Sequence, residues 1–234
     1  MRVDILTLFP DAVEAMMGAS ILGRARERGH LAIHCHQIRD YTANRQKQVD
    51  DYPYGGGLGM ILQADPLYRC LQHVWKVAGR GHTILLSPQG ALLRQDTARR
   101  FVTYPHLILV CGHYEGVDER FIEVCVQEEI SIGDYVLTGG EIPAMALCDA
   151  VCRLVPGVLS DESSFTGESH WDGLLEYPQY TRPEFWQGRA APPILLSGHH
   201  KNIQAWRRAQ SEERTRLRRP DLWARYLEKR GQGG

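Results

Sequence analysis

Hydrophobic residues along the first 40 positions switch between strand-like and helix-like spacing. Residues 3–9 form a short apolar run that ends at Pro10 and predict a buried strand. Residues 11–28 predict a helix, because apolar side chains recur every three to four positions and Gly29 follows as a stop signal. Residues 31–38 alternate apolar and polar side chains, as a half-buried strand does. The chain therefore begins with a strand, a helix and a second strand.

The same spacing rules predict further elements as far as residue 155. Residues 40–59 are polar and rich in glycine, which predicts a long loop. Strands are predicted over residues 83–86, 107–111 and 129–132, and helices over residues 67–77, 91–100, 117–126 and 143–155. This alternation of strands and helices favours an α/β domain with a largely parallel sheet over residues 1–160.

The composition changes near residue 160. Residues 160–173 have the composition of a loop, and loops of this length in compact proteins usually serve as linkers or lids. We therefore expect a flexible linker or lid over residues 161–175. Two helices are predicted beyond it, the first over about residues 198–214 and the second from Pro220, since proline suits the first position of a helix. Residues 176–234 are accordingly expected to form a small helical C-terminal domain.

Targeting signals and cysteine pairs are not evident in the sequence. The N-terminal segment is too short and too acidic for a signal peptide, and no apolar run reaches the length of a membrane span. We therefore expect a cytoplasmic protein without membrane partners. The six cysteines are scattered without a CxxC pair, which favours buried thiols over disulfides. Cys148 and Cys152 lie one helical turn apart but lack further ligands nearby, so no metal site is predicted.

Charge is distributed unevenly along the chain. Residues 199–230 contain ten lysines and arginines and four acids, a net charge of +6, so the remainder carries −7 to give the total of −1. A basic tail on an acidic body suggests that the tail meets a polyanion. The alternative is an ordinary solvated helix face, and charge alone does not separate the two.

Three glycine-containing loops follow three of the predicted strands. They cover residues 87–90, 112–116 and 132–140. Ligands of open α/β sheets bind beyond the carboxyl ends of the strands, and glycine lets the backbone approach a ligand closely. One pocket for a small flat molecule is therefore expected, although any single loop also fits an ordinary turn.

Several common active-site motifs are missing or incomplete. The sequence has no GxxxxGK[ST], Gly55 to Gly59 are not followed by a phosphate-binding lysine, and no GxGxxG opens a helix. Nucleoside triphosphate hydrolysis and dinucleotide redox chemistry are therefore poorly supported. His199 and His200 could suggest a metal site or a hydrolase, but without a third ligand or a nucleophile elbow the start of a helix is the better interpretation.

Five segments together resemble the bacterial tRNA (guanine-N1)-methyltransferases. They are residues 49–60 (VDDYPYGGGLGM), 87–90 (SPQG), 111–120 (CGHYEGVDER), 131–141 (SIGDYVLTGGE) and 180–183 (YTRP). They occur in the order and spacing of that family, and the similarity runs from the first strand to about Leu222.

The resemblance implies a trefoil-knotted α/β domain of the SPOUT class, although knots are rare in proteins generally. It also implies a homodimer with active sites at the subunit interface, S-adenosylmethionine held in the knot and a Mg²⁺ requirement. Carried over by position, the residues that would bind the cofactor are Leu86, Ser87, Pro88, Gly90, Gly112, Tyr114, Glu115, Ile132, Gly133, Asp134, Tyr135, Val136, Leu137, Gly139 and Gly140.

Methylation at N1 of guanine needs a base, because that nitrogen carries a proton, and a cation or donors near O6, where negative charge develops. The family's base is an Asp in the linker, usually followed by Ser-Phe. An ungapped alignment places Glu168 there, while a gapped one places residues 163–165 on the motif and leaves no acid. We therefore expect Glu168 to be the base and Arg153 to stabilise O6. The alternatives are a solvated Glu168 and an Arg153 paired with Asp149 at i−4.

The family acts on the guanosine immediately 3′ of the anticodon, which would be splayed out into the pocket. Phosphate contacts that position the tRNA are expected from Arg182, Arg207, Arg208, Arg214, Arg218 and Arg219. Two alternatives stay open: an RNA-binding module that keeps the knot but has lost the chemistry, and a SPOUT enzyme that methylates a different base.

Overall fold

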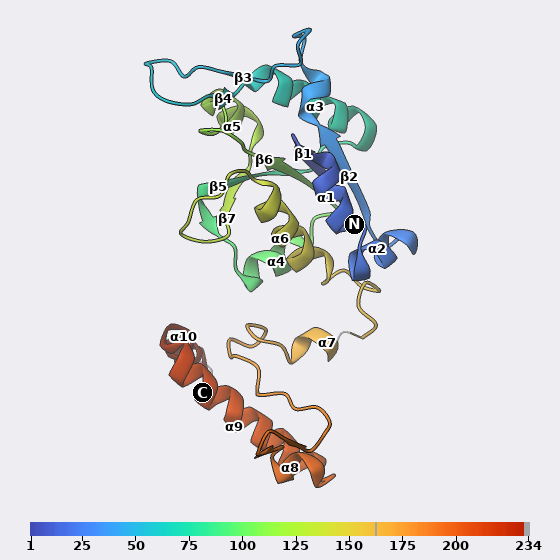
Figure 1. The fold of residues 1–234 in the computed structure, drawn as a ribbon, viewed down its shortest axis with the longest axis vertical. Coiled ribbons are helices and arrows are strands. Elements are labelled where there is room, and N and C mark those ends of the chain that lie inside the picture. Colours follow the sequence, from blue (N-terminus) through green and yellow to red (C-terminus); the bar gives the residue numbers. More distant parts are fainter. Residues whose placement is uncertain (162, 232–234) are drawn as a thin grey trace. The chain divides into compact units, whose positions relative to one another are not determined.

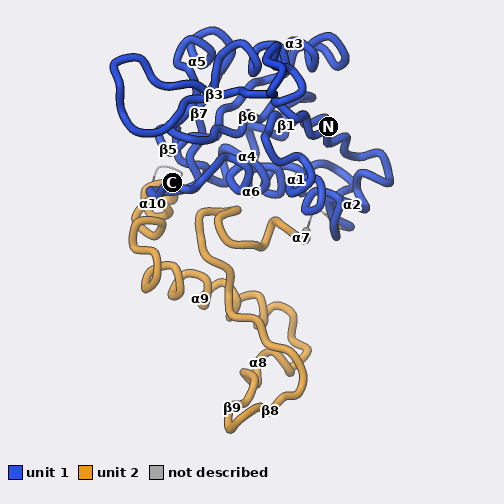
Figure 2. Tube along the Cα trace, turned by 45° about the horizontal axis from the view of Figure 1, so that its top comes forward, with its two compact units in different colours: residues 1–160 blue, residues 161–234 orange. Residues whose placement is uncertain are grey.

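The computed structural model describes residues 1–161 and 163–231. The chain divides into two compact units, Met1–Ser160 and Asp161–Gly234, which Figure 2 distinguishes by colour. Glu162 of the predicted linker and residues 232–234 of the predicted C-terminal domain lie outside the described residues, as do the side chains of Ser163 and Ser164. Each unit is described by itself.

In the described residues of the first unit, five strands form one parallel sheet in the order β2-β1-β6-β5-β7. The strands are β1 (Arg2–Thr7), β2 (Ala32–Gln37), β5 (His82–Leu92), β6 (His106–Cys111) and β7 (Glu128–Ser131). The predicted α/β class is therefore confirmed, since helices connect consecutive strands throughout.

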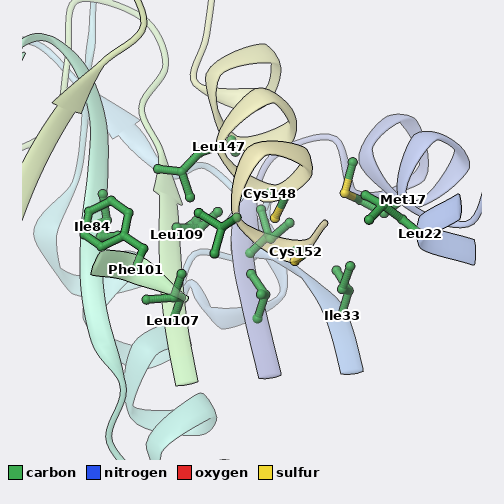
Figure 3. Packing of buried hydrophobic residues seen from close by; sticks show 14 of the residues in the cluster. Met17, Leu22, Ile33, Ile84, Phe101, Leu107, Leu109, Leu147, Cys148 and Cys152 are labelled. Atoms are coloured by element: carbon green, nitrogen blue, oxygen red, sulfur yellow. The ribbon is translucent and has the colours of Figure 1, made fainter. Parts of the chain in front are cut away.

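Helices cover both faces of this sheet (Figure 1). Alternate side chains of each strand point to opposite faces, so Leu107 and Leu109 join one core cluster while Ile108 joins the other. The first cluster packs under α1 (Pro10–Met17), α2 (Ser20–Glu27), α4 (Gln95–Phe101) and α6 (Glu141–Cys152), and Figure 3 shows its interior. The second packs under α3 (Ala64–Ala78) and α5 (Glu119–Cys125).

The helix predicted over residues 11–28 is two helices, α1 and α2, so that prediction was wrong. Ala19 between them has an extended backbone (φ −94°, ψ 157°). The two helices approach closely at this break, because a Cβ on Gly23 would lie 2.0 Å from the carbonyl oxygen of Gly18. The hydrophobic spacing continues across this break, so it did not reveal the bend that Gly18 and Gly23 allow.

Strand β5 is longer than predicted and includes residues 87–90, which had been expected to form a loop. Its pairing with β7 shifts register between Leu86 and Ala91, so these residues bulge toward the carboxyl end of the sheet. A Cβ on Gly90 would lie 2.4 Å from backbone atoms of Glu129 and Ile130, so glycine is required where the strands approach. As a result α4 begins at Gln95 rather than at residue 91.

A long connection between β2 and α3 carries short elements of its own. It contains the 3₁₀ helix η1 (Ile38–Tyr41) and the antiparallel pair β3 (Asp50–Asp51) and β4 (Ile61–Leu62). Backbone bonds attach this pair to the loop after β6, from Leu62 to Gly116 and from Glu115 to Met60. The glycine-rich residues 52–60 are thereby held beside that loop.

The second unit is built mainly from two helices, α9 (His200–Arg218) and α10 (Pro220–Gly231), close to the predicted positions. Leu222 and Tyr226 of α10 are buried against α9. Short elements that had not been predicted precede them: α7 (Ser163–Thr166), the hairpin of β8 (Phe185–Trp186) and β9 (Arg189–Ala190), and α8 (Pro193–Leu196). Across the described residues, every helix is too short or too polar to serve as a membrane span.

Candidate active site

A cleft of about 1660 Å³ opens at the carboxyl ends of β5, β6 and β7. Its walls come from residues 86–89, the loop after β6, the loop after β7 and the β3–β4 pair. Of the fifteen residues expected to bind a cofactor, thirteen line this cleft: Leu86, Ser87, Pro88, Gly112, Tyr114, Glu115, Ile132, Gly133, Tyr135, Val136, Leu137, Gly139 and Gly140. Gly90 and Asp134 are not among the lining residues. The structure thus brings together loops that are distant in sequence.

Close backbone packing explains two of the glycines in these loops. A Cβ on Gly140 would lie 2.7 Å from the Cα of Cys111, and one on Gly139 would lie 2.2 Å from Nε2 of His113. The Gly140 N–H also donates to the Gly112 carbonyl at 2.8 Å. The loops after β6 and β7 are therefore in direct contact, which a larger residue at either position would prevent.

Side chains around the cleft combine apolar and acidic character. Leu86, Ile132 and Leu137 contribute apolar surface, while Glu115 and Asp118 contribute carboxylates. A side-chain hydrogen bond from Arg120 lowers the pKa of Asp118. Beside the cleft, Cys111 is fully buried, and burial raises the pKa of its thiol well above the usual value, so this cysteine is no nucleophile at neutral pH.

A buried carboxylate links three segments beside the cleft. Glu141, the first residue of α6, accepts a hydrogen bond from the Thr7 hydroxyl at 2.7 Å and contacts Nε2 of His113 at 2.9 Å. His113 and Thr138 also line the cleft; they lie in two of the loops expected to form the pocket but are not among the residues expected to bind the cofactor. Only a contact map would have found the Thr7–Glu141 pair, since the two residues are 134 positions apart.

The two residues expected to act in catalysis belong to different units. Arg153 directly follows α6 and is half-buried, and its backbone N–H donates to the Asp149 carbonyl at 3.2 Å. Glu168 lies in the second unit just after α7, also half-buried. Backbone bonds from Glu168 to Phe165 and from Trp171 to Glu168 shape the segment around it.

The arginines expected to contact tRNA have unequal surroundings in the second unit. Arg208 donates to Asp172 at 2.7 Å, to Glu212 at 3.0 Å and to the Tyr226 hydroxyl, and Arg219 pairs with Asp221 at 2.7 Å. Burial alone would lower the pKa of Arg208, but these hydrogen bonds outweigh it and raise the pKa above its ordinary value. The Arg208 guanidinium therefore connects α9 to Asp172 and to α10, whereas Arg219 pairs with a residue two positions along the chain.

The remaining four arginines differ in exposure, and Arg207 and Arg214 are half-buried. Arg182 and Arg218 are exposed, and Arg214 donates to the Glu176 carbonyl at 3.4 Å. Arg207 stacks over the Tyr177 ring at 4.7 Å. Arg182 and Arg207 both line a second cavity, of about 410 Å³, whose other walls include Tyr177 and Tyr180.

Fold and site together define an α/β protein with a cleft among glycine-containing loops beyond its strands and with a basic helical second unit. The chain belongs to the tRNA (guanine-1)-methyltransferase family, whose model, described as tRNA (Guanine-1)-methyltransferase TrmD, matches residues 1–225. The family predicted from the sequence is therefore confirmed, while the trefoil knot stays a prediction.

Individual relatives agree with this assignment. A protein of Chloroflexus aurantiacus is 56% identical over 226 residues, covering 96% of this chain and 89% of the relative. One of Ruminiclostridium cellulolyticum is 53% identical over 224 residues (95% and 96%), and one of Lachnospira eligens is 49% identical over 230 residues (98% and 98%). Each of the three is named tRNA (guanine-N(1)-)-methyltransferase.

Proposed function

We propose that this chain transfers a methyl group from S-adenosylmethionine to N1 of the guanosine immediately 3′ of the anticodon in tRNA. The observation that carries the proposal is the convergence of three glycine-containing loops on one cleft, in a chain whose relatives carry that activity in their names. We place the reaction in the cytoplasm, where tRNA is modified.

The residues around the cleft suit S-adenosylmethionine. Small-molecule sites usually enclose roughly 300–1,000 Å³. A cleft of about 1660 Å³ therefore has room for the methyl donor and for part of a nucleotide. Apolar side chains such as Leu86 and Leu137 suit an adenine ring, and the nearby carboxylates of Glu115 and Asp118 suit a positively charged group. When bound, the donor supplies a methyl group on a sulfonium, which makes it electrophilic.

The chain's own residues must manage a proton and a developing charge. We assign Glu168 to removing the N1 proton of guanine, because a carboxylate is a competent base and the linker position matches the family's acid. We assign Arg153 to stabilising the negative charge that builds on O6. Holding the base and the methyl acceptor in line is expected to contribute several kcal/mol to lowering the barrier.

A homodimer with the active site at its interface would complete the site. Tyr135, Val136 and Leu137 in the loop after β7 and Ile142 of α6 are exposed apolar residues, and Val136 is 82% exposed. Exposed apolar clusters usually mark interaction surfaces. We infer that a second copy of the chain covers this apolar cluster and that the active site lies at the interface between the two copies.

The second unit is proposed to bind tRNA. Arg182 and Arg207 line a cavity together with two tyrosines, an arrangement that suits a phosphate next to an unstacked base. Arg214 and Arg218 would add phosphate contacts, whereas the guanidinium groups of Arg208 and Arg219 are partly occupied by Asp172 and Asp221. Mg²⁺ is expected to support turnover; among the described residues no His, Cys, Asp and Glu cluster could hold a metal ion.

The decisive experiment measures transfer of labelled methyl from S-adenosylmethionine to tRNA transcripts with guanosine or adenosine beside the anticodon. Only the guanosine transcript is expected to gain label, in the presence of Mg²⁺. Equal labelling of both transcripts would point to a different target base. Binding of tRNA without any turnover by the wild-type protein would support the RNA-binding module instead.

Variants test the two assigned residues. Glu168→Gln and Arg153→Ala are each expected to lower kcat about 100- to 10,000-fold, while binding of S-adenosylmethionine and tRNA stays close to wild type. Glu228→Gln and Arg28→Ala are matched controls: Glu228 is exposed on α10, and Arg28 is exposed directly after α2, as Arg153 directly follows α6. If the site spans two subunits, mixing the two inactive proteins after subunit exchange restores turnover, and a mixture that stays inactive contradicts the shared site.

A further inference from the structure

The carboxylate of Glu141 is the meeting point of three segments at the edge of the cleft. Glu141 is 8% exposed, and both of its oxygens are used: Oε1 by the Thr7 hydroxyl at 2.7 Å and Oε2 by Nε2 of His113 at 2.9 Å. Thr7 ends β1 and is fully buried, and its hydroxyl also accepts the Phe9 N–H at 2.9 Å. Burying a carboxylate is costly unless it has such hydrogen-bond partners, so the contacts with Thr7 and His113 are what stabilise Glu141 at this position.

His113 is held from several sides in addition to Glu141. Its backbone forms an antiparallel bridge with Gly139, and its ring packs against the Phe9 ring at 5.2 Å. Gly139 has to be glycine here, because a Cβ would collide with Nε2 of His113 and with Oε2 of Glu141. His113 therefore connects the loop after β6 to the loop after β7.

The residue that follows His113 has a strained backbone. Tyr114 has a φ of +60°, a left-handed conformation that non-glycine residues adopt only where their surroundings hold them. Its side chain lines the cleft, and its hydroxyl accepts a hydrogen bond from Arg39 at 3.2 Å. The anchor on its N-terminal side is His113, whose side chain is fixed by Glu141.

We propose that Glu141, acting through His113 and Thr7, is a positioning residue that sets the two loops, residues 112–116 and 132–140, which bind S-adenosylmethionine. The inference rests on the proposed function of this cleft. Glu141 is not among the residues that line the cleft, so we assign it no contact with the methyl donor or the reacting atoms. Its carboxylate ties the loop after β6 to β1 and α6, so that the loop backbone is already in its binding conformation before the ligand arrives.

The test compares variants that remove one hydrogen bond with variants that keep it. Glu141→Gln, Thr7→Val and His113→Phe each remove a donor or acceptor, whereas Thr7→Ser keeps the hydroxyl and His113→Gln keeps an N–H near the Nε2 position. Calorimetry of S-adenosylmethionine binding without tRNA is the readout. Glu123→Gln is the matched control, because this carboxylate is exposed on α5 and does not line the cleft.

We expect Glu141→Gln to weaken binding about ten- to a hundredfold, the range for losing hydrogen bonds to a charged group. Thr7→Val and His113→Phe should weaken it about three- to tenfold, and Thr7→Ser and His113→Gln should restore most of the loss. KM for the methyl donor is expected to rise by a similar factor, while kcat at saturation falls less than about threefold. The Thr7→Val/Glu141→Gln double variant should bind no more weakly than Glu141→Gln alone, since both changes act through one carboxylate.

Thermal unfolding of each variant separates this role from a loss of fold. If Glu141→Gln does not fold, the comparisons of Thr7→Val with Thr7→Ser and of His113→Phe with His113→Gln still test the positioning role. The inference is overturned if the wild type binds and turns over normally while Thr7→Val and His113→Phe bind S-adenosylmethionine as tightly as their conservative counterparts. A wild type that binds no S-adenosylmethionine would instead overturn the proposed function, and this inference with it.

Discussion

Asp4 in the middle of β1 is the most completely buried charge in the described part of the first unit, and removing it should be costly. Its side chain is fully buried and accepts four hydrogen bonds, two from Arg2 at 2.6 and 2.9 Å and one each from His36 and His106 at 2.7 Å. Burial by itself raises the pKa of the Asp4 carboxyl, but the bonds from His106, His36 and Arg2 outweigh it and hold the pKa well below its ordinary value.

The change Asp4→Ala leaves several of these donors without a partner. The His36 and His106 side chains are only 12% and 8% exposed, so water cannot easily replace the carboxylate, whereas Arg2 is 30% exposed and can turn outward. Breaking a buried pair in this way typically costs about 3–5 kcal/mol. We expect that loss here, a large part of a typical unfolding free energy of about 5–15 kcal/mol.

The assay is urea denaturation of the full chain, followed by tryptophan fluorescence at one fixed protein concentration. Asp40→Ala is the control: its salt bridge to Lys47 has the same 2.6 Å length as that of Asp4 to Arg2, but both side chains are more than half exposed. An exposed pair contributes only about 0–1 kcal/mol. If Asp4→Ala were destabilised no more than Asp40→Ala, burial would not be the cause of the stabilisation.

The same variant predicts a pH dependence with a definite sign. Because the folded pKa of Asp4 lies below the unfolded value of about 3.9, its contribution is present at neutral pH and is lost as the pH falls below about 4. The difference in stability between wild type and Asp4→Ala should therefore narrow in acid. A difference that widens on acidification would mean that the sign of the shift is wrong.

Three further outcomes are expected. Gly140→Ala should weaken S-adenosylmethionine binding at least about tenfold in calorimetry, because its Cβ would lie 2.7 Å from a neighbouring backbone carbon, whereas Gly167→Ala, with open space around it, should bind normally. Leu109→Ala should lower the free energy of unfolding in urea by about 2–5 kcal/mol, because Leu109 is fully buried. Leu217→Ala should lower it little, because Leu217 is 63% exposed, and equal losses in the two variants would contradict the packing described for Leu109. Affinity for tRNA should fall about 10³- to 10⁵-fold between 50 and 200 mM salt if six to ten phosphates are contacted, and Arg218→Ala should reduce that salt slope by about one.

Local sequence patterns predicted most strands and helices at nearly their observed positions. The runs near β1 and β6 succeeded because a strand buried on both faces is a short apolar segment whatever surrounds it. Two predictions failed where a neighbour decides the backbone. The break between α1 and α2 depends on the approach of Gly23 to Gly18, and the length of β5 depends on pairing with β7.

The candidate site was predictable in outline. Carboxyl ends of parallel strands meet at one edge of a sheet, so three glycine-containing loops after strands were expected to share a pocket, and most of their residues do line one cleft. The partners of individual side chains were not predictable in this way. Arg208 was read as a phosphate contact, yet Asp172, 36 positions away, occupies part of its guanidinium.

The sequence by itself determined the α/β class, the family, the contrast between an acidic body and a basic tail, and the segments that form the cleft. These features are carried by local patterns and by motifs that can be read along the chain. Only the tertiary structure decided which charges are buried and what holds them: Asp4 with His106, 102 positions away, and Glu141 with Thr7, 134 positions away. The physical reason is that a hydrogen bond depends on the distance between two groups in space, which the fold sets and separation along the chain does not.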